Sequence, residues 1–208
     1  CIRDREEAGE DFKVPPAPPK AVSADDDSST AFYGIHTFSD RMAFVLDLSW
    51  SMWRHAGDTR RIDAALAQLQ GAVGTLDETR RFAVVWFGTA AGTWRARTLA
   101  GIETEKRALA RWCQEVDGKG QTNAYDGLAE GFRFARRGAG RPQIDTLFFL
   151  TDGKATGGPF IRTSDLLGEL RAWARIERVR IHGIGIGESD PALLQGLAAL
   201  TGGRYVHK

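Results

Sequence analysis

The feature that most constrains the fold is the alternation of short apolar runs with longer segments that are apolar on one side only. Continuous or nearly continuous apolar runs are expected for strands covered on both faces of a sheet, and they occur at 42–46, 81–88 and 145–152. Apolar residues at helical spacing follow these runs, in the segments 61–76, 104–116, 123–137, 164–177 and 190–200. This order predicts a mostly parallel sheet with helices on both faces.

Weaker patterns complete the predicted sheet and mark where helices begin. Residues 179–187 and 203–208 predict two further strands, whereas 92–99 alternates weakly and predicts an edge strand. Asp190 followed by proline is a helix-start signal. Thr163 or Ser164 is the candidate cap of the helix before it.

The first 30 residues differ in composition from the rest of the chain. They hold four of the seven prolines, a cluster of acids and serines, and few apolar side chains. Such a stretch cannot bury enough surface to offset its ordering entropy. We therefore expect residues 1–30 to be a disordered linker and residues 31–208 to form one domain. A linker here indicates fusion to an upstream domain, although a ragged fragment end explains the composition equally well.

Charge and cysteine content exclude several classes of protein. Lys and Arg total 28 against 27 Asp and Glu, which gives no case for nucleic acid as the main partner. No apolar stretch approaches the 18 or so residues that a membrane span needs. Cys113 lies on a helical pattern and is expected to be a buried thiol, and Cys1 is either a lipoprotein cysteine or a fragment end. The compartment stays open, with an extracytoplasmic or cell-surface location preferred.

Oxygen-bearing side chains follow two of the predicted buried strands. Asp47 comes directly after the run 42–46, and Asp152 ends the third run. Both therefore lie where strands end, which is the ligand-binding edge of an open α/β sheet. In an extended loop, Asp47, Ser49 and Ser51 point the same way because side chains alternate. Three oxygens are then presented to one point.

A threonine in a third loop extends this set of oxygens. Thr122 lies in a glycine-bracketed loop at the entry of a predicted helix, where a hydroxyl can cap the helix or bind a ligand. Asp126 is a further candidate oxygen, but a structural hydrogen bond is the preferred role. Taken singly, Asp47, Ser49 and Asp152 are ordinary cap or turn residues. Together, two carboxylates and three hydroxyls suit Mg²⁺, Mn²⁺ or Ca²⁺ and not zinc or copper.

These residues carry a resemblance to a known family. DLSWS (47–51), Thr122 in QTNAYDGL and Asp152 in LTDG resemble the metal-ion-dependent adhesion site of von Willebrand factor type A (VWA) domains, and residues 32–52 resemble bacterial members. The resemblance covers residues 32–208. It implies a Rossmann-like three-layer α/β/α sandwich, with a mostly parallel six-stranded sheet and one antiparallel edge strand near 93–98.

The resemblance also implies how the site would be used. Ser49, Ser51 and Thr122 would contact the metal directly, and Asp47 and Asp152 would act largely through water. The chain departs from the family at Trp50, where glycine is usual between the two serines.

The expected function is a divalent-metal-dependent grip on another protein. An Asp or Glu carboxylate of the partner would complete the coordination of the metal. Trp50, Trp53 and His55 are candidate rim residues that contact the partner, although inward packing of Trp53 is an equal alternative.

Two other functions are weighed against this one. A scaffold or regulatory subunit coupled to an ATPase or a larger complex is the main alternative, because its sequence would look the same. An enzyme is disfavoured: an aspartyl phosphatase needs a second aspartate at the position of Ser49, and the sequence has neither a serine-hydrolase elbow nor a P-loop.

Overall fold

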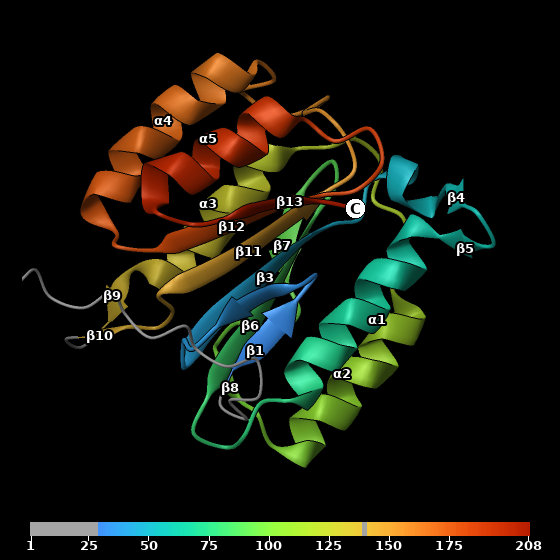
Figure 1. The fold of residues 1–208 in the computed structure, drawn as a ribbon, viewed down its shortest axis with the longest axis vertical. Coiled ribbons are helices and arrows are strands. Elements are labelled where there is room, and N and C mark those ends of the chain that lie inside the picture. The colour runs from blue at the N-terminus through green and yellow to red at the C-terminus, as the bar shows by residue number, and fades with distance from the viewer. Residues whose placement is uncertain (1–28, 139–140) are drawn as a thin grey trace, which may run out of the picture.

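The computed structural model describes residues 29–138 and 141–208, and a mostly parallel sheet lies at its centre (Figure 1). The strand order is β13-β12-β11-β3-β6-β7, and the short β8 also pairs with β6. The parallel strands are β3 (Arg41–Asp47), β6 (Arg81–Phe87), β11 (Thr146–Thr151), β12 (Arg180–Gly185) and β13 (Tyr205–His207). The predicted fold class is confirmed.

Helices cover both faces of this sheet, so the domain has three layers (Figure 1). One face packs against α1 (Arg61–Gly74) and α2 (Glu103–Glu115). The other face packs against α3 (Ala124–Ala135), α4 (Thr163–Ile176) and α5 (Pro191–Thr201). Side chains of β3 alternate between the two cores, with Phe44 in the first and Val45 in the second. Both faces are therefore apolar, which is why the strand runs are nearly continuous.

The antiparallel edge of the sheet is less regular than the sequence indicates. β7 (Ala91–Thr93) and β8 (Leu99–Ala100) both pair antiparallel with β6, and residues 94–98 between them form no strand. The Trp94 N–H still donates to the Val84 carbonyl of β6 at 2.9 Å, and its ring packs against Phe82 and Trp112, with centroids 6.3 Å apart in each pair. The sheet therefore has seven strands where six were predicted, and the edge predicted as one strand at 93–98 is two short strands, because the chain bends at residues 94–97 between them.

Helix caps agree with the sequence at one helix and differ at another. Asp190 caps α5 and accepts hydrogen bonds from the N–H groups of Ala192 and Leu193. The cap predicted for α4 is wrong, because Arg162 occupies that position without a side-chain bond. The hydroxyl of Thr163 instead donates to the second oxygen of Asp190, which ties the starts of α4 and α5 together.

Three short antiparallel strand pairs in the described residues lie outside the central sheet. β1 (Thr30–Phe32) pairs with β2 (Ile35–Thr37), and the buried Phe32 ring contacts Phe44 and Phe148. A 3₁₀ turn, η1 (Trp50–Trp53), leads to the pair β4 (His55–Ala56) and β5 (Thr59–Arg60). The remaining pair is β9 (Arg137–Gly138) with β10 (Arg141–Pro142).

Residues 1–28, which include Cys1 and nearly all of the predicted linker, lie outside the described part of the chain. Ser29 and Thr30 are described, and the buried Thr30 already belongs to β1. Cys113 is buried against the α1–α2 core as expected, and burial raises the pKa of its thiol to about 12. The described part of the chain holds no helix that is both long and apolar enough to cross a bilayer.

Candidate metal centre

The candidate site is built around Asp47, the last residue of the central strand β3. Its carboxylate is completely buried. One oxygen, Oδ1, accepts the N–H of Ser49 at 2.8 Å, and Oδ2 accepts the Thr151 hydroxyl at 2.6 Å. Burial raises the pKa of Asp47 to about 6, although both hydrogen bonds favour the charged form. Keeping a charged carboxylate at this position therefore lowers the free energy of unfolding.

Two serines and the second aspartate form a continuous cradle beside Asp47. The hydroxyls of Ser49 and Ser51 lie 3.0 Å apart. The Ser51 hydroxyl in turn donates to Oδ1 of Asp152 at 2.6 Å. Asp152 directly follows β11, the neighbour of β3 in the sheet, so the parallel strands bring the two loops together. The structure thus unites four of the five oxygen-bearing residues that the sequence predicts at this site.

Thr122 reaches the same edge from a third loop. This loop is bonded to the serine loop, because the Trp50 N–H donates to the Gly120 carbonyl at 2.9 Å and the Lys119 N–H donates to the Leu48 carbonyl at 2.7 Å. The main chain of Thr122 is held by the loop after Asp152, through Thr156. Its hydroxyl makes no hydrogen bond with any residue that the structure describes, which leaves that oxygen available to a ligand.

Asn123, and not Thr122, caps the helix that follows. The Asn123 side chain accepts the N–H of Asp126 at 3.1 Å and donates to the Asp126 carboxylate at 2.6 Å. Asp126 is therefore engaged in a structural hydrogen bond, as expected. Of the two roles that the sequence allows for Thr122, the capping role belongs to its neighbour.

Arg61 is a site residue that sequence reasoning missed. It is the first residue of α1, and its Nη1 donates to Oδ2 of Asp152 at 2.7 Å. The ion pair neutralises one of the two carboxylates and holds Asp152 with its other oxygen toward Ser51. A signal did exist in the sequence: a cation in the first turn opposes the helix dipole, so an arginine there needs an acidic partner from elsewhere.

The donor set fits a hard divalent cation. All five side chains offer oxygen, and the carboxylates lie among neutral hydroxyls. No three His, Cys, Asp or Glu side chains cluster anywhere in residues 29–138 and 141–208. Any metal held at this edge would therefore depend on the hydroxyls of Ser49, Ser51 and Thr122. Asp47 and Asp152 would support them through their hydrogen bonds to Ser49 and Ser51.

The three candidate rim residues differ in their exposure. Trp50 is 64% exposed, and its ring lies over Gly118, where a Cβ would come within 2.3 Å of the indole. His55 is exposed on β4. Trp53 is only half-exposed and packs against the α1 core, with the Arg60 guanidinium 4.8 Å above its ring. Trp50 and His55 can meet a partner directly, whereas Trp53 mainly supports the loop.

A sequence profile of the von Willebrand factor type A domain matches residues 40–207, which include the whole sheet from β3 to β13. The chain belongs to the von Willebrand factor type A domain family. A comparison with curated protein sequences finds no match to this VWA domain.

Solved structures share the fold of this VWA domain at low sequence identity. A von Willebrand factor type A protein from Catenulispora acidiphila has a TM-score of 0.66 and 21% identity, over 83% of this chain and 39% of that one. The BatB protein from Bacteroides thetaiotaomicron has a TM-score of 0.61 and 15% identity, over 81% and 89%. The PilB minor pilin from Streptococcus sanguinis has a TM-score of 0.60 and 16% identity, over 81% and 56%. This chain therefore spans well under half of the Catenulispora protein.

The burial of Asp47 leads to a prediction about stability without metal. Its folded pKa, about 6, lies above the ordinary value of 3.8, so the wild-type protein loses stability as pH rises from about 4 to about 6. Asp47→Asn keeps an acceptor for Ser49, and the Thr151 hydroxyl can accept from the new amide. We expect this variant, in chelator at pH 7.5, to have a free energy of unfolding about 1–3 kcal/mol higher than wild type, measured by urea denaturation.

The difference should shrink toward pH 4, where the wild-type carboxyl is protonated in the folded state. Asp165→Asn, at an exposed position in the first turn of α4, is the control; it loses a favourable interaction with the helix dipole and should lower stability by no more than about 1 kcal/mol, without the gain expected for Asp47→Asn. A variant less stable than wild type at pH 7.5 would mean that the hydrogen bonds to the charged carboxylate outweigh the cost of burying it.

Proposed function

We propose that this domain is a divalent-metal-dependent protein-binding module. VWA domains commonly mediate protein interactions. The observation that carries the proposal is the hydroxyl cradle of Ser49 and Ser51, bonded to Asp152 and lying beside the exposed Trp50. Mg²⁺ is the proposed ion, with Mn²⁺ or Ca²⁺ as substitutes, and Ser49, Ser51 and Thr122 would hold it directly.

The charges around the cradle favour an acidic group as the last ligand. The three hydroxyls are neutral, Asp47 is engaged by two donors, and Arg61 cancels the charge of Asp152. A divalent ion in this setting keeps most of its positive charge, and a hard cation prefers carboxylate oxygen. We therefore assign the open position to an Asp or Glu side chain of a partner protein.

The same contacts argue against hydrolysis. Asp47 stands where an aspartyl nucleophile would be expected, but it is fully buried and both of its oxygens accept hydrogen bonds. A nucleophile has to reach the substrate, and a carboxylate closed off from solvent at the end of β3 does not. We propose a binding role for the site and no catalytic one.

Metal binding should raise the melting temperature. At a metal concentration about tenfold above Kd, linkage gives roughly 1.4 kcal/mol, or about 3–6 °C for a domain of this size. We expect Mg²⁺ or Mn²⁺ to produce this shift in differential scanning fluorimetry, and Asp47→Ala to abolish it. Asp165→Ala, which removes an exposed carboxylate from the first turn of α4 and leaves the five oxygen-bearing residues intact, should keep it. An undiminished shift in Asp47→Ala would place the metal elsewhere.

Partner capture should depend on the cradle and on the rim in different ways. Immobilised domain is incubated with source-cell lysate, and captured proteins are identified by mass spectrometry. Thr122→Ala removes one neutral ligand. Thr122 is buried, but its hydroxyl has no hydrogen-bond partner among the described residues, so the free energy of unfolding without metal should fall by no more than about 1 kcal/mol, the cost of one buried methyl group. The Thr122→Ala domain should nevertheless fail to capture those proteins that EDTA elutes from the wild-type domain.

Trp50→Ala should weaken capture while leaving the metal-induced melting shift intact, because the indole is exposed and lies outside the oxygen set. A partner held equally well in EDTA and in Mg²⁺ would refute the metal-dependent grip, whatever its affinity.

A further inference from the structure

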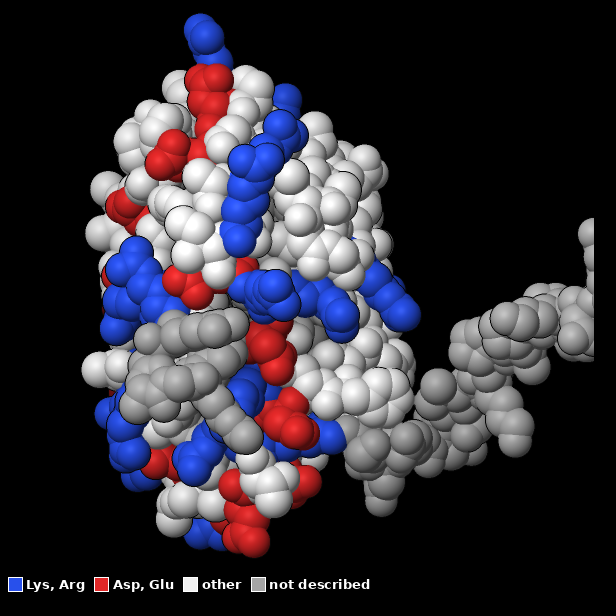
Figure 2. All heavy atoms as spheres, turned by 90° about the vertical axis from the view of Figure 1, so that its left-hand side faces the viewer, with Lys and Arg blue, Asp and Glu red and all other residues white. Residues whose placement is uncertain are grey.

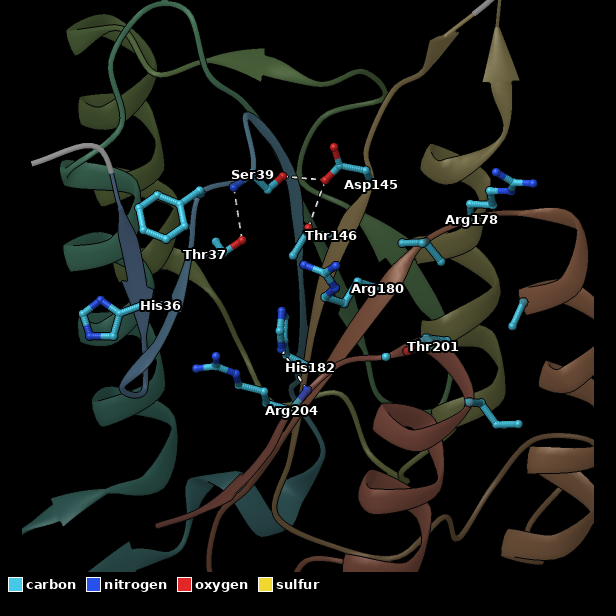
Figure 3. Close-up of a pocket in the computed structure, with 15 residues that line it drawn as sticks. His36, Thr37, Ser39, Asp145, Thr146, Arg178, Arg180, His182, Thr201 and Arg204 are labelled. Atoms are coloured by element: carbon cyan, nitrogen blue, oxygen red, sulfur yellow. Dashed lines mark hydrogen bonds between the residues drawn. The ribbon is translucent and has the colours of Figure 1, made fainter. Parts of the chain in front are cut away.

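A cavity lies at the edge of the sheet opposite to the candidate metal centre. Its volume is about 760 Å³, and its walls come from β2, the starts of β11 and β12, and the turn after α5 (Figure 3). Because Thr146 and Arg180 begin their strands, this is the edge where the parallel strands start. Figure 2 faces this edge and shows Lys and Arg side chains gathered across its middle, with acidic side chains among them.

The residues that line the cavity are mainly hydrogen-bond donors. Three arginines, Arg178, Arg180 and Arg204, line it together with a single carboxylate, Asp145. None of the three guanidinium groups has an ion pair or hydrogen bond with the residues that the structure describes. Asp145 is already engaged, since its Oδ1 accepts the hydroxyls of Ser39 and Thr146 at 2.5 and 2.9 Å. The Asp145 carboxylate keeps its charge, so three guanidinium groups against one carboxylate leave a positive balance at the cavity.

His182 provides an independent sign that an acceptor is missing. The ring is only 3% exposed and stacks on Phe148, with centroids 5.1 Å apart. Its Nδ1 accepts the N–H of Arg204 at 3.1 Å, so the proton of the neutral ring is on Nε2. Burial lowers the pKa of His182 to about 4, with help from Arg180 and Arg204, so the ring is neutral at pH 7.

The protonated Nε2 of His182 is buried and has no partner among the described residues. In Figure 3 this nitrogen points away from Arg204, toward the part of the cavity where Arg180 and Thr146 lie. A buried donor without an acceptor destabilises the fold, so such groups usually mark the place of a ligand or an ordered water.

We propose that this cavity binds the phosphoryl group of a small organic phosphate. A phosphate presents several acceptor oxygens and up to two negative charges, which matches the planar donor forks of Arg180 and Arg204 and the single donor of His182. The volume is typical of small-molecule pockets and exceeds what inorganic phosphate alone would fill. Phe38, which is 52% exposed at the wall of the cavity, offers an apolar surface for the rest of such a molecule.

Isothermal titration calorimetry on the full chain, in EDTA, tests this proposal separately from the metal centre. The probes are AMP and its uncharged counterpart adenosine, with inorganic phosphate as a third titrant. We expect AMP to bind more tightly than inorganic phosphate, adenosine to bind at least tenfold more weakly than AMP, and the affinity for AMP to fall as salt rises. Asp47→Ala should bind AMP as wild type does, because its defect lies at the other edge of the sheet.

Variants then assign the contacts. Arg180→Gln and Arg204→Gln should each weaken AMP binding at least tenfold. His182→Phe keeps a ring to stack on Phe148 and removes the Nε2 donor, so it should also weaken AMP binding. Arg107→Gln, at an exposed position on α2, is the matched control and should bind normally.

Two results would overturn the proposal: no binding of AMP or inorganic phosphate by the wild-type chain, or binding that is unchanged in both Arg180→Gln and Arg204→Gln. Circular dichroism melts of each variant show that any loss is measured on folded protein.

Discussion

The carboxylate of Asp47 is completely removed from water at the end of the central strand, and the loops at this edge of the sheet are arranged around it. A buried charge is tolerated only where donors replace its hydration. The donors here come from the next loop, through the Ser49 N–H, and from the neighbouring strand, through the Thr151 hydroxyl. Satisfying Asp47 therefore also fixes where the Ser49 and Ser51 hydroxyls lie. The cradle is a consequence of how the buried charge is held.

The two edges of the sheet have opposite chemical character. At the carboxyl ends of the strands, Asp47, Asp152 and the hydroxyls collect oxygen acceptors, and Arg61 offsets only part of their charge. At the amino ends, arginines collect around the neutral His182 with one engaged carboxylate among them. The two candidate sites lie at opposite ends of the same parallel strands and share none of the side chains named for them. The proposed cation site and the proposed anion site can therefore be tested by separate substitutions.

Much of the fold and part of the site could be predicted from the sequence, and the reason is the same for both. Strands buried on both faces read as apolar runs, and the residues that end them, such as Asp47 and Asp152, are placed at one edge by the parallel order alone. Contacts made by side chains distant in sequence leave no local pattern. Such contacts include the Arg61–Asp152 ion pair, the packing of Trp94 on Trp112, and the cavity around His182. Of these contacts, only the ion pair of Arg61 is indicated by the sequence, because a positive charge in the first turn of a helix opposes the helix dipole.

The most direct test of the metal-dependent account is an anomalous difference map from crystals of the domain grown or soaked in saturating Mn²⁺. The account predicts one strong peak at the carboxyl edge of the sheet, at a bonding distance of about 2 Å from the hydroxyl oxygens of Ser49, Ser51 and Thr122, with Asp47 and Asp152 behind them. Crystals of Asp47→Ala treated in the same way should lack the peak. A wild-type map with no peak against these hydroxyls, or with its strongest peak at another surface of the domain, would contradict the account.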